Sequence, residues 1–101
     1  MDRLFNALAE PFRRAVVLSL VHGEQTLTTL AAPFCLTMPA VMKHISVLER
    51  AGLIKTEKRG RARYCRLKPE RLAIAGDWIT DATNFWTQRL ESLAIHLERE
   101  L

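Results

Sequence analysis

The side chains that could do chemistry in this 101-residue chain are mostly cations, and they gather in one segment. Residues 55–71 carry eight basic and two acidic side chains, whereas residues 1–54 carry five basic and four acidic ones. Residues 77–101 carry two basic and five acidic ones, which leaves a net charge of +4. A basic block between near-neutral or acidic segments favours an anionic partner, with nucleic acid first. A solvated loop rich in Lys and Arg is the alternative explanation.

A second group of polar side chains belongs to residues 37–54, TMPAVMKHISVLERAGLI, which we predict to form a helix. A threonine suits the N-cap, a proline is tolerated in the first turn, and a glycine ends the helix. Helical spacing then separates two faces. The inward face carries Val41, Ile45 and Leu48, and the outward face carries Pro39, Lys43, Ser46 and Arg50.

The outward face of this helix suits nucleic acid. Lys43 lies at its centre and can bind a phosphate or a guanine base. Thr37 and the helix N-terminus suit a phosphate. Ala40 and Val47 flank the face, and His44 lies on its boundary. Ala40 and His44 could touch base edges, although His44 could equally pack or cap at the helix boundary. We therefore expect DNA contacts from Thr37, Ala40, Lys43 and His44.

Catalytic and metal-binding chemistry finds no support in the sequence. No nucleophile has a matched base, no carboxylate pair lies in a pocket context, and no Gly-rich loop could bind phosphate. His96 and Glu100 at i, i+4 could touch, but two ligands rarely hold zinc, so an exposed surface pair is the better interpretation. We expect neither an enzyme, nor a metal site, nor a cofactor.

Two cysteines, Cys35 and Cys65, lie in unrelated contexts and form neither a CxxC motif nor a disulfide framework. Cys35 precedes the helix described above, and Cys65 lies in a predicted strand. Tyr64 and Arg66 flank Cys65, and a nearby Arg could lower its pKa. A redox switch is therefore one interpretation, and two small semi-buried hydrophobic side chains are the favoured one.

Three helices are predicted ahead of residue 37. The second starts at Pro11 and ends at the His-Gly pair of residues 22–23, and the third runs from Thr26 toward Pro33. Arg13 and Arg14 open the second helix and suit internal salt bridges and phosphates equally. The apolar faces of the three helices are Leu4, Phe5 and Leu8, then Val16, Val17, Leu20 and Val21, then Leu27, Leu30 and Ala31.

After residue 52 the apolar period changes to two. Residues 53–57 and 63–67 are predicted strands, and residues 58–62 are the predicted tip of a hairpin. Pro69 starts a final helical region, in which apolar residues recur at spacings of three and four from Asp77, a predicted cap. Since the chain has no repeat and no linker, we expect one domain over residues 1–101.

This order of elements predicts a mainly α fold with a small β-hairpin, a winged helix-turn-helix. In that arrangement the second helix of the pair enters the DNA major groove. The basic hairpin, or wing, can reach an adjacent minor groove or phosphates. The wing residues expected to contact DNA are Lys58, Arg59, Arg61 and Arg63.

The sequence resembles the ArsR-type winged-helix transcriptional repressors over essentially its whole length. The resemblance is carried by LFNALAEPFRRAVVLSL, by LTTLAAPFCLTMPAVMKHISVLERAGLI and by KTEKRGRARYCRL. It implies a homodimer that binds a pseudo-palindromic operator and usually represses its own operon. Family members commonly carry Ser before the lysine of the recognition helix, whereas this chain has Met42, which cannot hydrogen-bond a phosphate.

The metal-site motifs of this family have no match in the sequence. Relatives carry a Cys-x-Cys pair on the third helix, where this chain reads TLTTLAAPF, or Asp-x-His on the last helix, where it reads DWITDAT. The chain therefore resembles a subgroup without these motifs. The expected function is a sequence-specific repressor that does not sense metal. The alternatives are a thiol-redox repressor using Cys35 and Cys65, a non-specific architectural DNA-binding protein, and a protein-interaction module.

The last helix carries too much apolar surface for the outer helix of a monomer, and the first helix adds to it. Burial against a twin in a two-fold dimer is the physical solution, although some of these residues must be buried within one chain. No apolar run could cross a membrane, and the N-terminus lacks a signal peptide, so we expect a cytoplasmic protein with an unknown inducer. The interface candidates are Leu4, Phe5, Leu8, Trp78, Phe85, Trp86, Leu90, Leu93 and Leu97.

Overall fold

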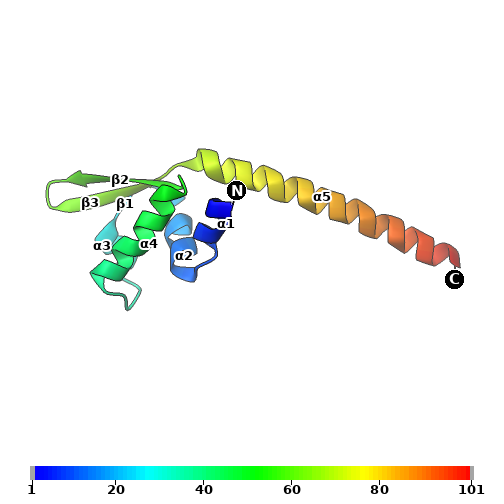
Figure 1. Ribbon diagram of the computed structural model, residues 1–101, viewed down its shortest axis with the longest axis horizontal. Helices are drawn as coiled ribbons and strands as arrows, with labels where there is room; N and C mark the ends of the chain where they lie inside the picture. Colours follow the sequence, from blue (N-terminus) through cyan, green and yellow to red (C-terminus); the bar gives the residue numbers. More distant parts are fainter. Residues whose placement is uncertain (1, 101) are drawn as a thin grey trace.

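A long C-terminal helix projects from a body of short helices and a small sheet in the computed structural model, which describes residues 2–100 (Figure 1). The chain measures 68 × 27 × 23 Å along its principal axes, because the outer part of this helix extends well beyond the body. The elements are α1 (Asp2–Leu8), α2 (Pro11–Leu20), β1 (Gln25–Thr26), α3 (Leu27–Ala31), α4 (Met38–Arg50), β2 (Ile54–Arg59), β3 (Ala62–Leu67) and α5 (Pro69–Glu100). The predicted winged helix-turn-helix is confirmed.

Side-chain caps begin α3 and α4, as predicted. The hydroxyl of Thr26 accepts a hydrogen bond from the Thr29 N–H at 3.2 Å, and that of Thr37 accepts one from the Ala40 N–H at 3.4 Å. Pro39 occupies the first turn of α4, where its missing N–H removes no helical hydrogen bond. The recognition helix therefore starts at a position fixed by its own sequence.

The C-terminus of α4 closes in a Schellman motif. Gly52, with φ of 75°, donates from its N–H to the Glu49 carbonyl at 2.9 Å, and the Leu53 N–H donates to the Leu48 carbonyl at 3.1 Å. A positive φ is available to glycine without steric cost. This turn ends α4 and starts the chain toward β2.

The sheet has three strands in the order β1-β3-β2, all antiparallel. Strands β2 and β3 pair from Ile54 opposite Leu67 to Arg59 opposite Ala62. The predicted tip of five residues at 58–62 is therefore wrong, because the strands continue to a two-residue turn at positions 60–61. The sequence did not predict β1, which is two residues long and too short to show an alternating pattern.

The core lies where α1, α2, α3 and α4 meet the sheet. The predicted inward face of α4 is confirmed, since Val41, Ile45 and Leu48 have at most 1% of their surface exposed. Val21 was expected on the buried face of α2, and that prediction is wrong. The helix ends one residue earlier, at Leu20, and Val21 turns out to solvent with 61% of its surface exposed.

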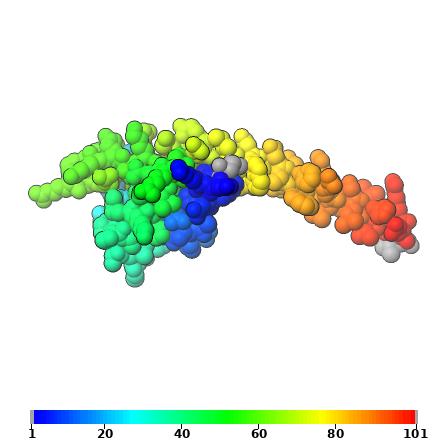
Figure 2. Space-filling view, viewed as in Figure 1, coloured from blue at the N-terminus to red at the C-terminus, as the bar shows by residue number. Residues whose placement is uncertain are grey.

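Helix α5 is continuous from Pro69, so the predicted cap at Asp77 is wrong and Asp77 lies within the helix. Near its start, Leu72 packs on the core and Ala75 is buried. The Trp78 ring then meets the Phe5 ring of α1 edge-on, with centroids 5.6 Å apart. Beyond this contact the outer part of α5 stands clear of the rest of the chain (Figure 2).

Candidate nucleic-acid interface

The outward face of α4 is open to solvent at its N-terminal half. Thr37, Met42 and Lys43 are exposed, and Ala40 is half-buried. Within residues 2–100, no carboxylate lies within ion-pairing distance of the Lys43 ammonium. This face therefore combines a helix N-terminus, small side chains and one unpaired cation, which suits a phosphate-lined groove.

His44 lies at the edge of that face and is half-buried. Its ring packs on the Phe12 ring of α2 with centroids 5.4 Å apart, and its Nδ1 lies 3.1 Å from Arg13 Nη1. The structure thus shows the packing expected as one alternative for His44. A contact between His44 and a base stays a prediction.

Arg13 and Arg14 serve the turn between α1 and α2. Arg13 donates from Nε to the Ala7 carbonyl at 2.8 Å and from Nη2 to the Asn6 carbonyl at 3.1 Å. Arg14 donates from Nη1 to the carbonyls of residues 8 and 9. The expected internal salt bridges are not among the ion pairs of residues 2–100, since carbonyl oxygens are the acceptors, and a phosphate contact stays a prediction. The two cations hold the C-terminus of α1 against the start of α2. Positive charge is favourable at the C-terminus of α1, because the last carbonyl groups of a helix are free acceptors.

Glu10 caps α2 beside these arginines. Its carboxylate accepts a hydrogen bond from the Arg13 N–H at 2.8 Å. Partial burial acts to raise the pKa of Glu10. The hydrogen bonds from the Arg13 and Phe12 N–H groups, together with the positive charge of Arg13, outweigh burial, so the pKa of Glu10 is lowered. The sequence analysis missed this cap because Glu is not a usual N-cap residue.

The cations of the wing differ in their hydrogen-bond partners. Lys58, near the end of β2, and Arg61, in the turn between β2 and β3, are exposed. Figure 1 shows that this hairpin projects from the body on the side away from the free end of α5. Arg63 donates to the Thr56 hydroxyl at 3.2 Å. The hydroxyl of Thr56 in turn donates to the Glu49 carboxylate of α4 at 3.2 Å. The base of the wing is therefore tied to the recognition helix.

Arg59 differs from the other wing cations because two carboxylates hold it. Its guanidinium donates to both oxygens of Glu24, at 2.6 and 2.9 Å, and to Glu57 at 3.0 Å. It also lies over the Tyr64 ring, 4.7 Å from the centroid. The hydrogen bonds to Glu24 and Glu57 raise the pKa of Arg59. The sequence placed Arg59 with the DNA-contacting cations, and the structure adds a competing internal partner.

Comparison with known proteins agrees with this geometry. Residues 8–57 match a family model described as a helix-turn-helix domain. The HTH-type transcriptional regulator Rv2034 of Mycobacterium tuberculosis is 36% identical over 99 residues, which is 98% of this chain and 90% of that protein. A crystal structure of an ArsR family transcriptional regulator is 40% identical, with a TM-score of 0.78 over 85% of this chain and 89% of that one.

The chain belongs to the ArsR family of transcriptional regulators. The transcriptional repressor SdpR of Bacillus subtilis is a further relative, 26% identical over 84 residues, with 83% of this chain and 93% of that protein covered. The resemblance inferred from the recognition helix and wing motifs is confirmed. The chain is a transcriptional regulator with a DNA-binding fold.

The thiols of this ArsR-family regulator differ in exposure. Cys35 is exposed in the segment before α4, and Cys65 is buried in β3. Burial raises the pKa of Cys65 to about 11, with the Glu49 charge adding to the effect and Arg63 opposing it only in part. A neighbouring Arg does act to lower this pKa, but removal from water dominates, so the expected low-pKa thiol is not observed at Cys65.

Metal ligands do not gather in the described part of the chain. Residues 2–100 contain no group of three His, Cys, Asp or Glu side chains placed to hold a metal ion. His96 Nε2 and Glu100 Oε1 lie 3.0 Å apart on the surface of α5, which is the expected i, i+4 pair. Across the same residues, no helix is long and apolar enough to cross a membrane.

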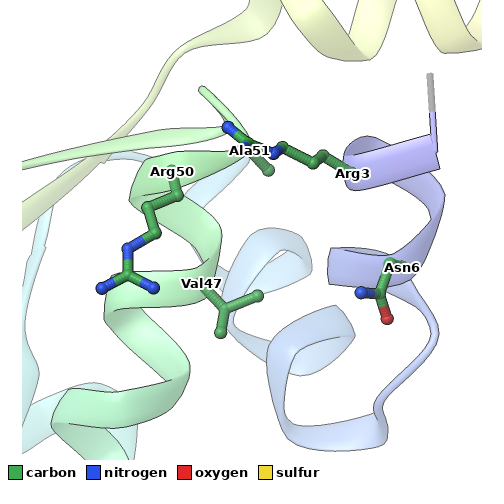
Figure 3. A pocket seen from close by; sticks show the side chains of 5 residues that line it. All are labelled: Arg3, Asn6, Val47, Arg50 and Ala51. Carbon is green, nitrogen blue, oxygen red and sulfur yellow. The ribbon is translucent and has the colours of Figure 1, made fainter.

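A hollow of about 200 Å³ lies between α1 and the C-terminal end of α4, and no pattern in the sequence indicated it. In Figure 3, Arg3 reaches from α1 toward Ala51, and Arg50 runs along α4. Cations near a helix C-terminus suit its negative dipole end. The hollow is smaller than ordinary ligand pockets, and helix stabilisation accounts for its arginines.

The predicted dimer surfaces of the ArsR-family regulator divide into covered and open residues. The prediction that Leu4 contributes to the dimer interface is wrong, because Leu4 is buried in the core of its own subunit with 2% of its surface exposed. Phe5 and Leu8 are partly buried against the same core. The six candidates on α5 are each 49–63% exposed, and they are Trp78, Phe85, Trp86, Leu90, Leu93 and Leu97.

Proposed function

We propose that this ArsR-family regulator is a homodimeric repressor that binds a pseudo-palindromic operator, including one at its own promoter, and does so without sensing metal. The outward face of α4 carries the proposal. Its inward face is complete core, yet Lys43 on the other face is exposed and unpaired within residues 2–100. Packing within the subunit does not explain the composition of the outward face, whereas contact with a DNA groove does.

Helix α4 enters the major groove by its N-terminal half. Thr37 and the positive end of the α4 dipole, with the Met38 N–H, bind a phosphate, and Lys43 binds a phosphate or a guanine. Ala40 allows close approach to base edges, with His44 beside it. The wing contacts the flanking backbone through Lys58, Arg61 and Arg63, and through Arg59 once its carboxylate partners release it.

The apolar stripe of α5 supports a two-fold dimer. Its first members, Leu72 and Ala75, pack on the subunit's own body. The same stripe continues at spacings of three and four along the projecting part of the helix, where nothing within residues 2–100 covers it. The continuing residues are Ile79, Ala82, Trp86, Leu90, Leu93 and Leu97. A second copy of the chain removes this apolar surface from water, and a two-fold axis gives each subunit the same contact.

The dimer sets the spacing of the DNA contacts. Two α4 helices related by a two-fold axis read half-sites about one helical turn apart, roughly 34 Å. A pseudo-palindrome in the DNA then matches the symmetry of the protein.

Selection of binding sites from a random duplex library tests the proposal and identifies the operator sequence at the same time. We expect enrichment of one inverted repeat. Lys43→Ala and Arg61→Ala weaken binding to the selected duplex about tenfold or more, while Arg99→Ala removes one equal charge from the end of α5 and leaves binding unchanged. Failure to enrich any sequence over bulk DNA contradicts the repressor and favours the architectural alternative.

A further inference from the structure

One ring nitrogen of His44, on α4, already has a partner within its own subunit. His44 Nδ1 lies 3.1 Å from Arg13 Nη1, within hydrogen-bonding distance. The same Nδ1 lies 3.7 Å from Glu10 Oε2, which is too long for a hydrogen bond. The contact with Arg13 is the hydrogen bond, and it therefore determines which nitrogen of the His44 ring carries the proton.

The donor inventory then fixes the tautomer. A guanidinium has only N–H donors and no acceptor, so His44 Nδ1 must accept and carries no proton. In a neutral imidazole the proton then resides on Nε2. A proton on Nδ1 would point at the guanidinium, with Glu10 too far away to compensate.

His44 Nε2 is left free to act outside the subunit. It has no hydrogen-bond partner within residues 2–100, and these residues contain no buried side-chain nitrogen or oxygen without a partner. Nε2 is therefore open to solvent, on a side chain that is 24% exposed. His44 lies one residue after Lys43, at the edge of the outward face.

The surroundings of His44 hold the ring and its partner still. The Phe12 ring lies against the imidazole, and Phe34 packs edge-on against Phe12 at 4.8 Å. Arg13 is anchored by its bonds to carbonyls of α1, so it cannot follow the histidine if the ring turns. The ring orientation and the tautomer are thus set by the same contacts.

We propose that Arg13 is a positioning residue that holds His44 as the Nε2–H tautomer, so that α4 presents one fixed donor to an acceptor on a base edge. This inference rests on the proposed entry of α4 into the major groove. The acceptors there are purine N7, guanine O6 and thymine O4, whereas the adenine and cytosine amino groups are donors and are rejected. Arg13 therefore acts on base choice without touching DNA.

The tautomer can be measured in the free protein, independently of DNA binding. At pH 8, ¹⁵N NMR of wild-type protein is expected to show His44 with protonated Nε2 and unprotonated Nδ1. In Arg13→Met, which keeps an apolar stem without donors, we expect a mixture of tautomers. A wild-type ring protonated on Nδ1 overturns the proposal, even if the protein binds DNA as proposed.

Two substitutions of His44 separate its two nitrogens. Asn places a polar atom near the Nδ1 position, and Gln places an N–H donor near the Nε2 position. On the selected duplex, we expect His44→Gln to stay within about threefold of wild type. We expect His44→Asn to lose about tenfold, together with the base preference that distinguishes acceptor from amino-group positions on the base edge. Equal losses in both variants, with the base preference kept, contradict the role of Nε2.

Arg13→Met is expected to lose the same base preference as His44→Asn, while its salt dependence stays that of wild type, because Arg13 binds no phosphate. A reduced salt slope identifies Arg13 as a phosphate contact and overturns its positioning role. If no duplex is selected at all, the proposed function fails, and the NMR result still decides the tautomer.

Discussion

The two carboxylate oxygens of Glu24, the residue before β1, accept hydrogen bonds from the Arg59 guanidinium of the wing at 2.6 and 2.9 Å. Two parallel N–H···O bonds are a geometry in which an exposed ion pair is ordered. Arg59 is therefore held by its own subunit at the place where a DNA phosphate would compete for it.

Removing the Glu24 charge takes away the two-bond partner of Arg59 and leaves Glu57 as its one carboxylate partner within residues 2–100. We expect Glu24→Gln to strengthen binding to any duplex a few-fold and to steepen the salt dependence by about one phosphate, a change of roughly 0.9 in the slope of log K against log salt. Fluorescence anisotropy at several salt concentrations measures both. Glu98→Gln makes the same charge change far along α5 and serves as the control. An unchanged slope in Glu24→Gln would mean that Arg59 does not reach a phosphate.

Glu10 gives a pH dependence to stability. Its pKa is lowered in the folded protein, so the ionised carboxylate stabilises the fold at neutral pH, and this contribution is lost as the pH falls below about 4.5 through the folded-state value. Urea unfolding at pH 7 should show Glu10→Gln less stable by about 1 kcal/mol, the usual cost of a lost cap. At pH 3 the gap between variant and wild type should close. The exposed Glu91→Gln is the control, and a gap that persists at pH 3 would contradict this role of the Glu10 carboxylate.

The two thiols should react at very different rates. With a pKa of about 11 and full burial, Cys65 is about one part in a thousand thiolate at pH 8, and reagents cannot reach it. We expect DTNB to titrate one thiol per folded chain rapidly, that of Cys35, and two in urea. Cys35→Ser should leave no fast thiol. A fast reaction in that variant would show that Cys65 opens to solvent and would revive the redox alternative.

The dimer surface can be tested with two leucine-sized side chains of equal exposure. Leu93 lies on the apolar stripe of α5 with 53% of its surface exposed, and Ile95 lies off the stripe with 52% exposed. Sedimentation equilibrium is expected to show Leu93→Glu as a monomer and Ile95→Glu as a dimer. Dissociation by Ile95→Glu alone would place the interface on another face of the helix.

The parts of the fold set by neighbouring residues could be predicted from the sequence. The Thr37 cap, the turn at Gly52 and the buried stripe of α4 each depend on a few adjacent side chains. Asp77 shows the limit of such signals, because a capping residue inside a longer helical segment has the same local sequence. Strand β1 is defined by its pairing with β3 and has no pattern of its own.

The parts of the site set by distant residues could not be predicted in this way. The Arg59 cation meets a carboxylate 35 positions away, and His44 meets a guanidinium 31 positions away. The sequence identified Arg59 and His44 as polar residues that could contact DNA. Only the fold shows that each has an internal partner, and that partner decides what each can offer to DNA.

Preference for one DNA sequence is the property that defines the proposed repressor. The deciding measurement is the ratio of the dissociation constants of the wild-type protein for the selected inverted repeat and for a scrambled duplex of the same composition, at about 0.15 M salt. A specific regulator binds its site roughly 10³-fold or more tightly than other DNA, and we predict a ratio of at least that order. A ratio near one would contradict the proposed function, because α4 would then contribute charge but no base recognition.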